Sequence, residues 1–339
     1  MPADLSPKEF IHLTAHSGHH AAYHDMFSDL FGLSPSIGKI DVTIFRKLLS
    51  AERLFFGTLD DDIRGFTIVA LARAVLGRRT GGLFLHPNSC FGSCIKAKVK
   101  WLLFAFLSRF PGVTILSILP YELMPELREV SSAYVHDPQF WDQLDAPPSV
   151  DDEVVRQLHE AAAGRPILGY LGSGTPQKAF PFLAAIATEP GFIDRIMVVA
   201  AGKMSDSCQA AADQLRNIGA AVWQRFVSDE EMAAIYSTSR WIWNSYAPGY
   251  EQASGIFGRA VQQGRPVAIR HDSVTLAYYT RLLRHPAVRL PDDAPGAATR
   301  LIAAINERSD DLPQLDETAL ILRNWKTDFI AAVNKSMQK

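Results

Sequence analysis

Short apolar runs separated by amphipathic stretches organise the first half of the chain. An apolar stretch at 10–13 precedes a helical pattern over His19–Phe31, and β-like runs follow at 54–58, 83–85, 113–119 and 133–135. Helical stretches lie between some of these runs. Alternation of short strands and helices is typical of an α/β domain with a mostly parallel sheet.

A break in this pattern falls near residues 145–149, where the sequence reads Asp-Ala-Pro-Pro-Ser. Two prolines within a short polar segment are typical of a hinge or linker. The alternation then restarts, with strands expected at 166–171, 195–200, 221–226, 241–243 and 266–269 and helices at 178–188, 208–218, 229–236 and 254–263. Gly264 is expected to end the last of these helices. Two α/β domains in tandem would leave a cleft between them, where ligands usually bind.

Composition narrows the class of protein. The chain has 339 residues, enough for two domains, with 47% hydrophobic and 21% charged residues, which is an ordinary globular mixture. A net charge of −2 does not favour nucleic-acid binding. Three cysteines (Cys90, Cys94 and Cys208) cannot all pair with one another, which favours a reducing compartment. We see no secretory signal and no apolar run long enough to span a membrane, so we expect a cytoplasmic protein.

A glycine-rich loop follows the first strand of the second half. It reads Gly172-Ser173-Gly174-Thr175-Pro176-Gln177-Lys178. Glycines let the backbone approach a ligand closely, the next helix would offer free N–H groups to a phosphate, and Lys178 would add a positive charge. A plain structural turn between strand and helix is the alternative.

A second feature surrounds the helix expected at 254–263. Ser254 can cap this helix, and Gly255 allows another group to lie against its first turn. Glu251 comes just before it, where a carboxylate could accept hydrogen bonds from sugar hydroxyls, or could simply complement the helix dipole.

Together these features resemble the C-terminal domain of retaining, nucleotide-sugar-dependent GT-B glycosyltransferases, over roughly the third of the chain from Pro166 to Val267. The loop from Gly172 to Lys178 is similar to the family's diphosphate loop, and Gly202 to its next glycine turn. The segment containing Phe226 and Val227 is similar to the one that passes the nucleotide base. Glu251 and the later Gly-Arg-Pro-Val sequence resemble the family's Glu-x7-Glu helix and the strand after it.

Two residues depart from the family pattern. Ser173 stands where the family has an arginine that contacts the diphosphate, and Arg259 stands where its second glutamate holds the nucleotide ribose. Arg259 could contact a phosphate instead, because a guanidinium suits phosphate geometry, or it could be an ordinary surface arginine.

The resemblance implies a fold of two Rossmann-like domains facing each other across a cleft. We expect an N-terminal acceptor-binding domain at 1–148, a donor-binding domain at 149–312, and a C-terminal helix within 313–339 that packs back on the first domain. An amphipathic helix at 317–333, with Trp325 and Phe329 on its apolar side, fits the last expectation.

The implied function is transfer of a sugar from a nucleotide-diphosphate sugar to a saccharide or lipid-linked acceptor, with retained configuration, no metal and no cofactor. Lys178 would neutralise the leaving diphosphate, helped by the helix start at Ser254 and Gly255 and by Arg259. Glu251 would orient the transferred sugar. Two alternatives remain: a non-catalytic GT-B subunit that supports an active partner, which Ser173 and Arg259 would explain, and a nucleotide-sugar epimerase of the same fold.

Histidines in the first half are further candidates. The sequence His16-Ser17-Gly18-His19-His20 lies where the family places its first strand–helix loop, so Gly18, His19 and His20 are expected to contact acceptor or donor. His16, His20 and His24 are spaced by four, which suits a metal on a helix, but no accompanying metal motif is present and we expect none. His86 resembles a cleft histidine of related enzymes, with a structural role as the alternative.

The charge distribution has one local bias. No acidic residue occurs between Asp62 and Glu122, and Lys96, Lys98 and Lys100 lead into the apolar run that starts at Trp101. Basic residues beside an apolar helix suit docking on an anionic membrane surface. The alternative is a core helix with lysines at its rim.

Overall fold

The computed structural model describes residues 8–14, 19–305, 307 and 315–338. The chain forms two compact units. Unit 1 comprises the chain up to Pro138 together with the segment from Asn324 onward, and unit 2 comprises Gln139–Arg323. The chain therefore leaves unit 1 after Pro138 and returns to it near the C-terminus. Cys90, Cys94 and Cys208 are free thiols.

Unit 1 contains a six-stranded parallel sheet in the order β2-β1-β3-β4-β5-β6. Its strands are β1 (Glu9–Leu13), β2 (Ser34–Ile37), β3 (Arg53–Phe56), β4 (Thr80–Phe84), β5 (Val113–Ser117) and β6 (Ala133–Tyr134). The helices are α1 (His19–Phe31), α2 (Val42–Ser50), α3 (Ile63–Val75), α4 (Ile95–Leu107) and the C-terminal part of α12 (Leu315–Met337). Short 3-10 turns lie at Pro87–Cys90 and Pro125–Glu129.

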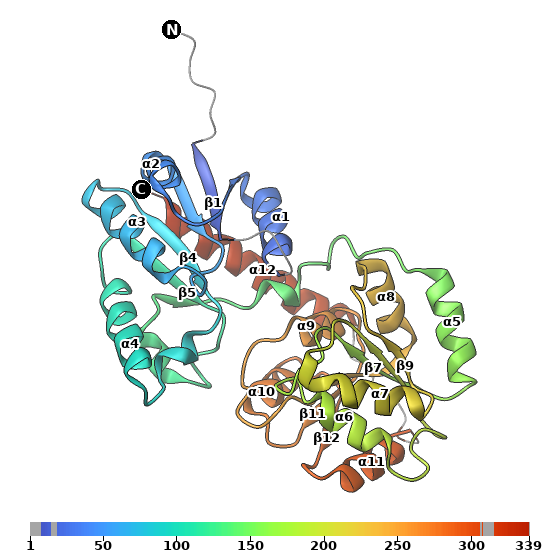
Figure 1. Cartoon of the computed structure of the whole chain (residues 1–339). Coiled ribbons are helices and arrows are strands. Elements are labelled where there is room, and N and C mark those ends of the chain that lie inside the picture. Colours follow the sequence, from blue (N-terminus) through green and yellow to red (C-terminus); the bar gives the residue numbers. More distant parts are fainter. Residues whose placement is uncertain (1–7, 15–18, 306, 308–314, 339) are drawn as a thin grey trace. The chain divides into compact units, whose positions relative to one another are not determined.

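Helix α12 completes the core of unit 1 although it is far from the sheet in sequence (Figure 1). Phe329 and Val333 are fully buried, and the Phe329 ring lies 5.8 Å from that of Phe27. A side chain at Gly81 of β4 would approach Ser336 Oγ to 2.2 Å, so the helix lies directly against this strand.

Unit 2 contains a second six-stranded parallel sheet, in the order β12-β11-β10-β7-β8-β9. Its strands are β7 (Ile167–Leu171), β8 (Met197–Ala201), β9 (Ala221–Trp223), β10 (Ser239–Asn244), β11 (Val267–Arg270) and β12 (Ala287–Leu290). Counted within the unit, this is the 3-2-1-4-5-6 order of dinucleotide-binding folds, with its switch point between β7 and β10.

The helices of unit 2 are α5 (Asp152–Ala162), α6 (Phe180–Ala187), α7 (Gln209–Asn217), α8 (Asp229–Thr238), α9 (Gly255–Gln262), α10 (Val274–Leu282) and α11 (Ala294–Ala303), with 3-10 turns at Pro138–Phe140 and Asp206–Cys208. Five of these helices, α6 to α10, connect successive strands, while α5 precedes β7 and α11 follows β12. Gly264 follows α9 with φ 62°, the left-handed conformation expected of a residue that ends a helix.

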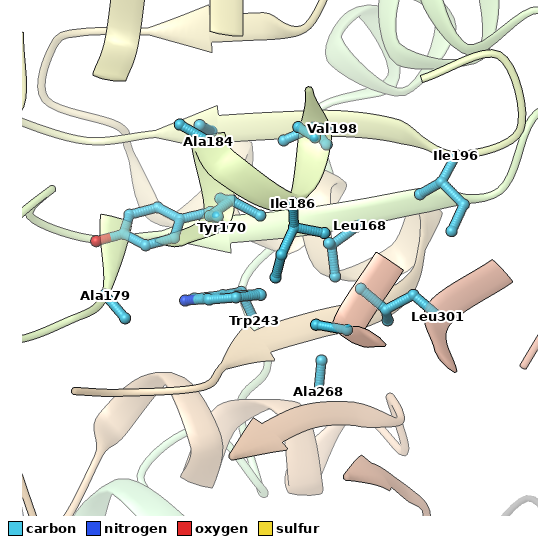
Figure 2. Packing of buried hydrophobic residues seen from close by; sticks show 14 of the residues in the cluster. Leu168, Tyr170, Ala179, Ala184, Ile186, Ile196, Val198, Trp243, Ala268 and Leu301 are labelled. Carbon is cyan, nitrogen blue, oxygen red and sulfur yellow. The ribbon is translucent and has the colours of Figure 1, made fainter. Parts of the chain in front are cut away.

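The core of unit 2 holds the loop after β7 in place. Figure 2 shows the Trp243 ring among the buried side chains of Tyr170, Ile186 and Leu168. The indole Nε1 of Trp243 donates a hydrogen bond to the carbonyl of Lys178 at 3.2 Å, and Tyr170 Oη donates to the carbonyl of Ser173 at 2.8 Å. Buried aromatic rings with a polar edge thus fix both ends of the glycine-rich loop.

Candidate functional site

The switch point of unit 2 brings together the two loops singled out in the sequence. In open parallel sheets, ligands bind beyond the carboxyl ends of the strands where the strand order reverses. Here β7 leads into the loop of Gly172 to Lys178, and β10 leads into the segment that contains Glu251 and Ser254. Ala247 N donates a hydrogen bond to the carbonyl of Gln177 at 2.9 Å, which joins the two segments directly.

Glycines after β7 and β8 allow their two loops to pack closely. Gly172 has φ 94° and Gly202 φ 141°, and a Cβ on Gly202 would come 2.1 Å from the carbonyl oxygen of Gly172. Gly172 N donates to the carbonyl of Ala201 at 2.9 Å, and Gly174 N donates to that of Lys203 at 2.8 Å. These glycines are required by loop-to-loop packing, and the N–H groups of Gly172 and Gly174 are already paired.

The start of α6 corrects one expectation. The predicted helix begins at 178, whereas α6 begins at Phe180, because Ala179 has φ 51° and Pro181 occupies the second helical position. Phe180 N donates to the carbonyl of Thr175 at 3.2 Å, and Pro181 has no N–H. The first two positions of the helix therefore offer no free N–H to a phosphate.

Lys178 is the cationic group that this arrangement leaves available. Its side chain is half-buried, and its Nζ lies 3.1 Å from where a Cβ on Gly172 would stand. Within the part of the chain that the structure describes, no carboxylate pairs with this ammonium. Burial lowers the pKa of Lys178 because the charged form is partly desolvated. An anion beside Nζ would relieve that cost.

Ser173 and Gly174 differ in exposure. Ser173 has an exposed side chain, where an arginine of the resembling family would stand, and its hydroxyl is free to meet a ligand. Gly174 is buried, and a Cβ there would lie 2.1 Å from the sulfur of Met204. Gly174 therefore has a packing role.

Glu251 binds the start of α10. Its carboxylate accepts hydrogen bonds from Thr275 N at 2.8 Å and Ser273 Oγ at 3.3 Å, and lies 3.4 Å from Arg270 Nη2. The side chain is 27% exposed. The carboxylate thus complements a helix dipole, that of α10 rather than α9, and is held in a fixed orientation.

Ser254 is the N-cap of α9, as the sequence predicts. Its Oγ accepts a hydrogen bond from Phe257 N at 3.2 Å and lies 2.5 Å from Tyr246 Oη. Tyr246 Oη also donates to Asn244 Oδ1 at 3.0 Å. A buried hydroxyl network therefore links the end of β10 to the start of α9, and sequence reasoning missed Tyr246 and Asn244.

The glycines of α9 face the segment that enters unit 2. A Cβ on Gly255 would lie 2.2 Å from Gln139 Oε1, and one on Gly258 would lie 2.4 Å from the carbonyl oxygen of Gln139. Gln262 Nε2 donates to that same carbonyl at 2.9 Å. The group lying against the first turn of α9 is Gln139.

Arg259 is held in a network of ion pairs. Its guanidinium lies 3.3 Å from Asp142 Oδ2 and 3.4 Å from Asp229 Oδ1, and its side chain is only 13% exposed. Burial lowers the pKa of Arg259, but the carboxylates of Asp142 and Asp229 and the neighbouring Tyr236 outweigh it, so the pKa is raised. Arg259 is therefore not a loose surface residue, and contact with a phosphate would require it to leave two carboxylates.

Phe226 and Val227 lie between β9 and α8. Phe226 is 77% exposed, which is unusual for an aromatic ring, whereas Val227 is 7% exposed and packs inward. Ser228 and Glu231 form a capping box at the start of α8, which fixes the segment that presents Phe226.

In unit 1, His86 lies beyond β4 and contacts a carboxylate that sequence reasoning missed. Its Nδ1 is 3.4 Å from Asp60 Oδ1, and Asp60 Oδ2 accepts hydrogen bonds from the backbone N–H groups of Leu85 at 2.8 Å and His86 at 3.3 Å. The hydrogen bond to Asp60 raises the pKa of His86 despite partial burial. The sequence feature that could have identified Asp60 is the run Asp60-Asp61-Asp62, which follows the apolar strand β3 with residues 57–59 between them.

The basic run on α4 is only partly available to a membrane. Lys96 and Lys98 are exposed, but Lys100 donates a hydrogen bond to Ser89 Oγ at 2.6 Å and lies 3.9 Å from Asp60 Oδ1. Trp101 Nε1 donates to Glu129 Oε2 at 2.9 Å. Lys100 and Trp101 thus make contacts within unit 1, whereas Lys96 and Lys98 remain exposed. None of the helices formed by the described residues has the length and apolar character needed to cross a bilayer.

The remaining candidate residues of unit 1 come at or just before the start of α1 in the sequence. Gly18, like His16, lies outside the described residues, and His19 and His20 are the first residues of α1. Among the described residues, one group of three possible metal ligands occurs, His271, Asp272 and Asp292, all exposed. Asp272 is already paired with Arg270.

Comparison with known proteins supports the fold through structure rather than sequence. No protein-family model matches the chain, and no curated protein matches its sequence. The crystal structure of HepE from Anabaena in complex with UDP-glucose is similar with a TM-score of 0.65 at 9% identity, covering 97% of each chain.

Trehalose-phosphate synthases are also similar. That of Burkholderia multivorans has a TM-score of 0.55 at 13% identity, covering 93% of this chain and 83% of that one. A UDP-forming enzyme from Burkholderia xenovorans has a TM-score of 0.57 at 10% identity, covering 94% and 86%. The chain therefore has the GT-B fold with two Rossmann-like domains, as the sequence predicts.

Proposed function

We infer that this chain is a glycosyltransferase that uses a nucleotide-diphosphate sugar as donor. The observation that carries the inference is the unpaired ammonium of Lys178 beside Gly172, at the switch point of a sheet with dinucleotide-binding strand order. The similar HepE structures contain UDP or UDP-glucose, which supports the same class of donor here.

Lys178 is the main cationic contact proposed for the donor diphosphate. A departing diphosphate carries developing negative charge, and a preoriented cation in a partly desolvated site stabilises it without a metal. The hydroxyl of Ser173 is exposed on the same loop and can donate one hydrogen bond. Arg259 is assigned no direct phosphate contact, because Asp142 and Asp229 already neutralise it.

Glu251 and Phe226 supply the remaining donor contacts in this proposal. The carboxylate of Glu251 is oriented by Thr275 N and Arg270, and its exposed part can accept hydrogen bonds from the transferred sugar. The exposed ring of Phe226 offers an apolar face to the nucleotide base.

Transfer with retained configuration to a saccharide or lipid-linked acceptor completes the proposal, with a hexose as the transferred sugar and surface polysaccharide as the product class. His86, held by Asp60, is the candidate in unit 1 for contact with the reacting groups, together with Gly18, His19 and His20. We place the reaction in the cytoplasm, where nucleotide sugars are the available donors.

A thermal-shift screen against UDP, GDP, ADP, TDP and their sugar conjugates tests donor binding. A ligand at about 100 times its dissociation constant should stabilise the fold by about 2.7 kcal/mol. We expect one nucleotide to raise the melting temperature, Lys178→Ala to abolish the rise, and the matched control Arg195→Ala, an exposed residue of unit 2, to leave it unchanged. A shift that survives in Lys178→Ala would refute the assigned site.

A non-catalytic subunit is the second candidate. The ion pairs of Arg259 favour it, because the position of the family's ribose-binding glutamate is occupied by a cation that contacts Asp142 instead. Absence of a thermal shift with any nucleotide would support this alternative. Interconversion of two nucleotide sugars without an acceptor would instead indicate an epimerase.

A further inference from the structure

Helix α4 exposes a continuous apolar stripe. Ile95, Val99, Leu102 and Phe106 follow one another at spacings of four, three and four residues, and are 80%, 58%, 61% and 52% exposed. Residues at these spacings lie on one face of a helix. Large apolar side chains are rarely exposed in a row, so the stripe requires an explanation.

Packing within unit 1 does not explain this stripe. The opposite face of α4 is buried through Ala97, Phe104 and Leu107, and the Phe104 ring stacks on Phe84 of β4 at 4.2 Å. The helix therefore already contributes one apolar face to the core. The core-helix interpretation of the sequence is correct for that face and leaves the stripe unaccounted for.

Helix α3 also exposes apolar residues. Its exposed residues Ile68, Val75 and the adjoining Leu76 are 59%, 82% and 57% exposed. Because β3, β4 and β5 are successive neighbours in a parallel sheet, right-handed crossovers place α3 and α4 on the same face of that sheet. Both helices pack against β5 (Figure 1). We call the exposed residues of these two helices the α3–α4 surface.

The charge of the α3–α4 surface has one sign. Neither helix carries an acidic residue, while Arg64, Lys96 and Lys98 are exposed on them. The carboxylate of Glu129, from outside the two helices, accepts a hydrogen bond from Trp101 Nε1. At about 100° per residue, Lys98 lies to one side of the stripe and Lys96 to the other. Lysine stems can lie along an apolar surface while their ammonium groups reach towards anions.

We propose that the α3–α4 surface docks on an anionic lipid bilayer, with α4 lying in the plane of the interface. An apolar stripe flanked by lysines matches both components of that interface, the acyl boundary and the negatively charged headgroups. The stripe residues enter the boundary, and Lys96 and Lys98 contact headgroup phosphates. This docking does not depend on the proposed glycosyl transfer.

Vesicle flotation of the full chain tests this proposal. We compare vesicles of phosphatidylcholine alone with vesicles that contain about one third phosphatidylglycerol. The expected result is binding to the anionic vesicles that weakens with added salt, and weak binding to neutral ones. Two double variants, Leu102→Ser with Phe106→Ser and Lys96→Glu with Lys98→Glu, should each lower the partition coefficient by about tenfold or more.

Matched double variants in unit 2 control for the loss of apolar groups and charge. Leu282→Ser with Leu320→Ser alters two exposed leucines, and Arg195→Glu with Arg281→Glu makes the same change in net charge. Both should bind vesicles as the wild type does. All four substituted pairs are exposed, so circular dichroism and the melting temperature should be unchanged.

Three outcomes would overturn the proposal. These are no flotation of the wild type, equal flotation with neutral and anionic vesicles, and a loss that is the same in control and stripe variants. Sedimentation that shows a dimer of the wild type, lost with Leu102→Ser and Phe106→Ser, together with no flotation, would assign the surface to a second copy of the chain.

Discussion

Individual side chains at the candidate site are held by neighbours that no local pattern indicates. Lys178 is bounded by Gly172, Glu251 by Arg270 and the start of α10, and His86 by Asp60. Lys178 and Glu251 were predicted as candidates because their segments resemble those of GT-B glycosyltransferases. His86 was predicted because it ends a strand and resembles a cleft histidine of related enzymes. The sequence could not predict that Arg259 would pair with Asp142, since 117 residues separate them and only the folded chain brings them together.

Asp60 should control the titration of His86. The hydrogen bond between them raises the pKa of His86, so this contact stabilises the fold below the ordinary histidine pKa of about 6.5 and its contribution is lost as pH rises through the raised value. In Asp60→Asn the pKa of His86 should fall, because the charged acceptor is gone while an amide oxygen remains for Leu85 N.

Nuclear magnetic resonance of the His86 Cε1 proton measures this titration. Asp61→Asn is the matched control, because Asp61 affects His86 only through a weaker charge interaction. Equal titration midpoints in the wild type and Asp60→Asn would contradict the assigned contact.

At the scale of elements, apolar runs were sufficient to predict most strands. Each run predicted as a strand forms one, because strands of a parallel sheet that is covered on both faces are continuously apolar. β2 was not predicted, because its sequence, Ser-Pro-Ser-Ile, has no continuous apolar run. The strand lies at the edge of the sheet, where proline is tolerated. The late start of α6 depends on the left-handed Ala179, which no residue type signals.

Two glycines of α9 should differ in their tolerance of a side chain. In Gly258→Ala, the new Cβ would lie 2.4 Å from a backbone oxygen of Gln139, whereas in Gly255→Ala it would meet the flexible side chain of Gln139. Overpacking against the backbone destabilises a fold by about 1–3 kcal/mol. Replacing a helical glycine by alanine stabilises the helix by up to about 1 kcal/mol, because alanine has the higher helix propensity. We expect Gly258→Ala to lower the free energy of unfolding and Gly255→Ala to change it little.

Urea unfolding, followed by tryptophan fluorescence, compares the two variants. Equal stability of Gly255→Ala and Gly258→Ala would show that α9 does not pack against Gln139 as described.

At the scale of the whole molecule, the chain closes unit 1 with residues from its other end. Ring contacts of Phe329 with Phe27 and Phe31, and the stacking of Trp325 on His136 at 3.5 Å, join α12 to elements almost 200 residues or more distant. An amphipathic pattern predicted the helix, and the resemblance to GT-B enzymes suggested which domain it would join. Its exact partners follow only from the fold.

Truncation of the buried Phe329 should therefore destabilise unit 1. Phe329→Ala removes a fully buried ring, which typically costs about 3–5 kcal/mol. Leu320→Ala, at an exposed position of the same helix, is the matched control and should cost little. Hydrogen exchange should show faster exchange in β1 and β3 of unit 1 for Phe329→Ala alone. Uniformly unchanged exchange would contradict the placement of α12.

The central claim is that the chain is a glycosyltransferase. The most direct test incubates the protein with the nucleotide sugar that gives the largest thermal shift. Nuclear magnetic resonance follows the anomeric proton over time without an acceptor. We predict slow release of the nucleoside diphosphate and free sugar, because water can replace the acceptor, and loss of this release in Lys178→Ala. A donor that binds but stays intact in the wild type, as in Lys178→Ala, would contradict the claim.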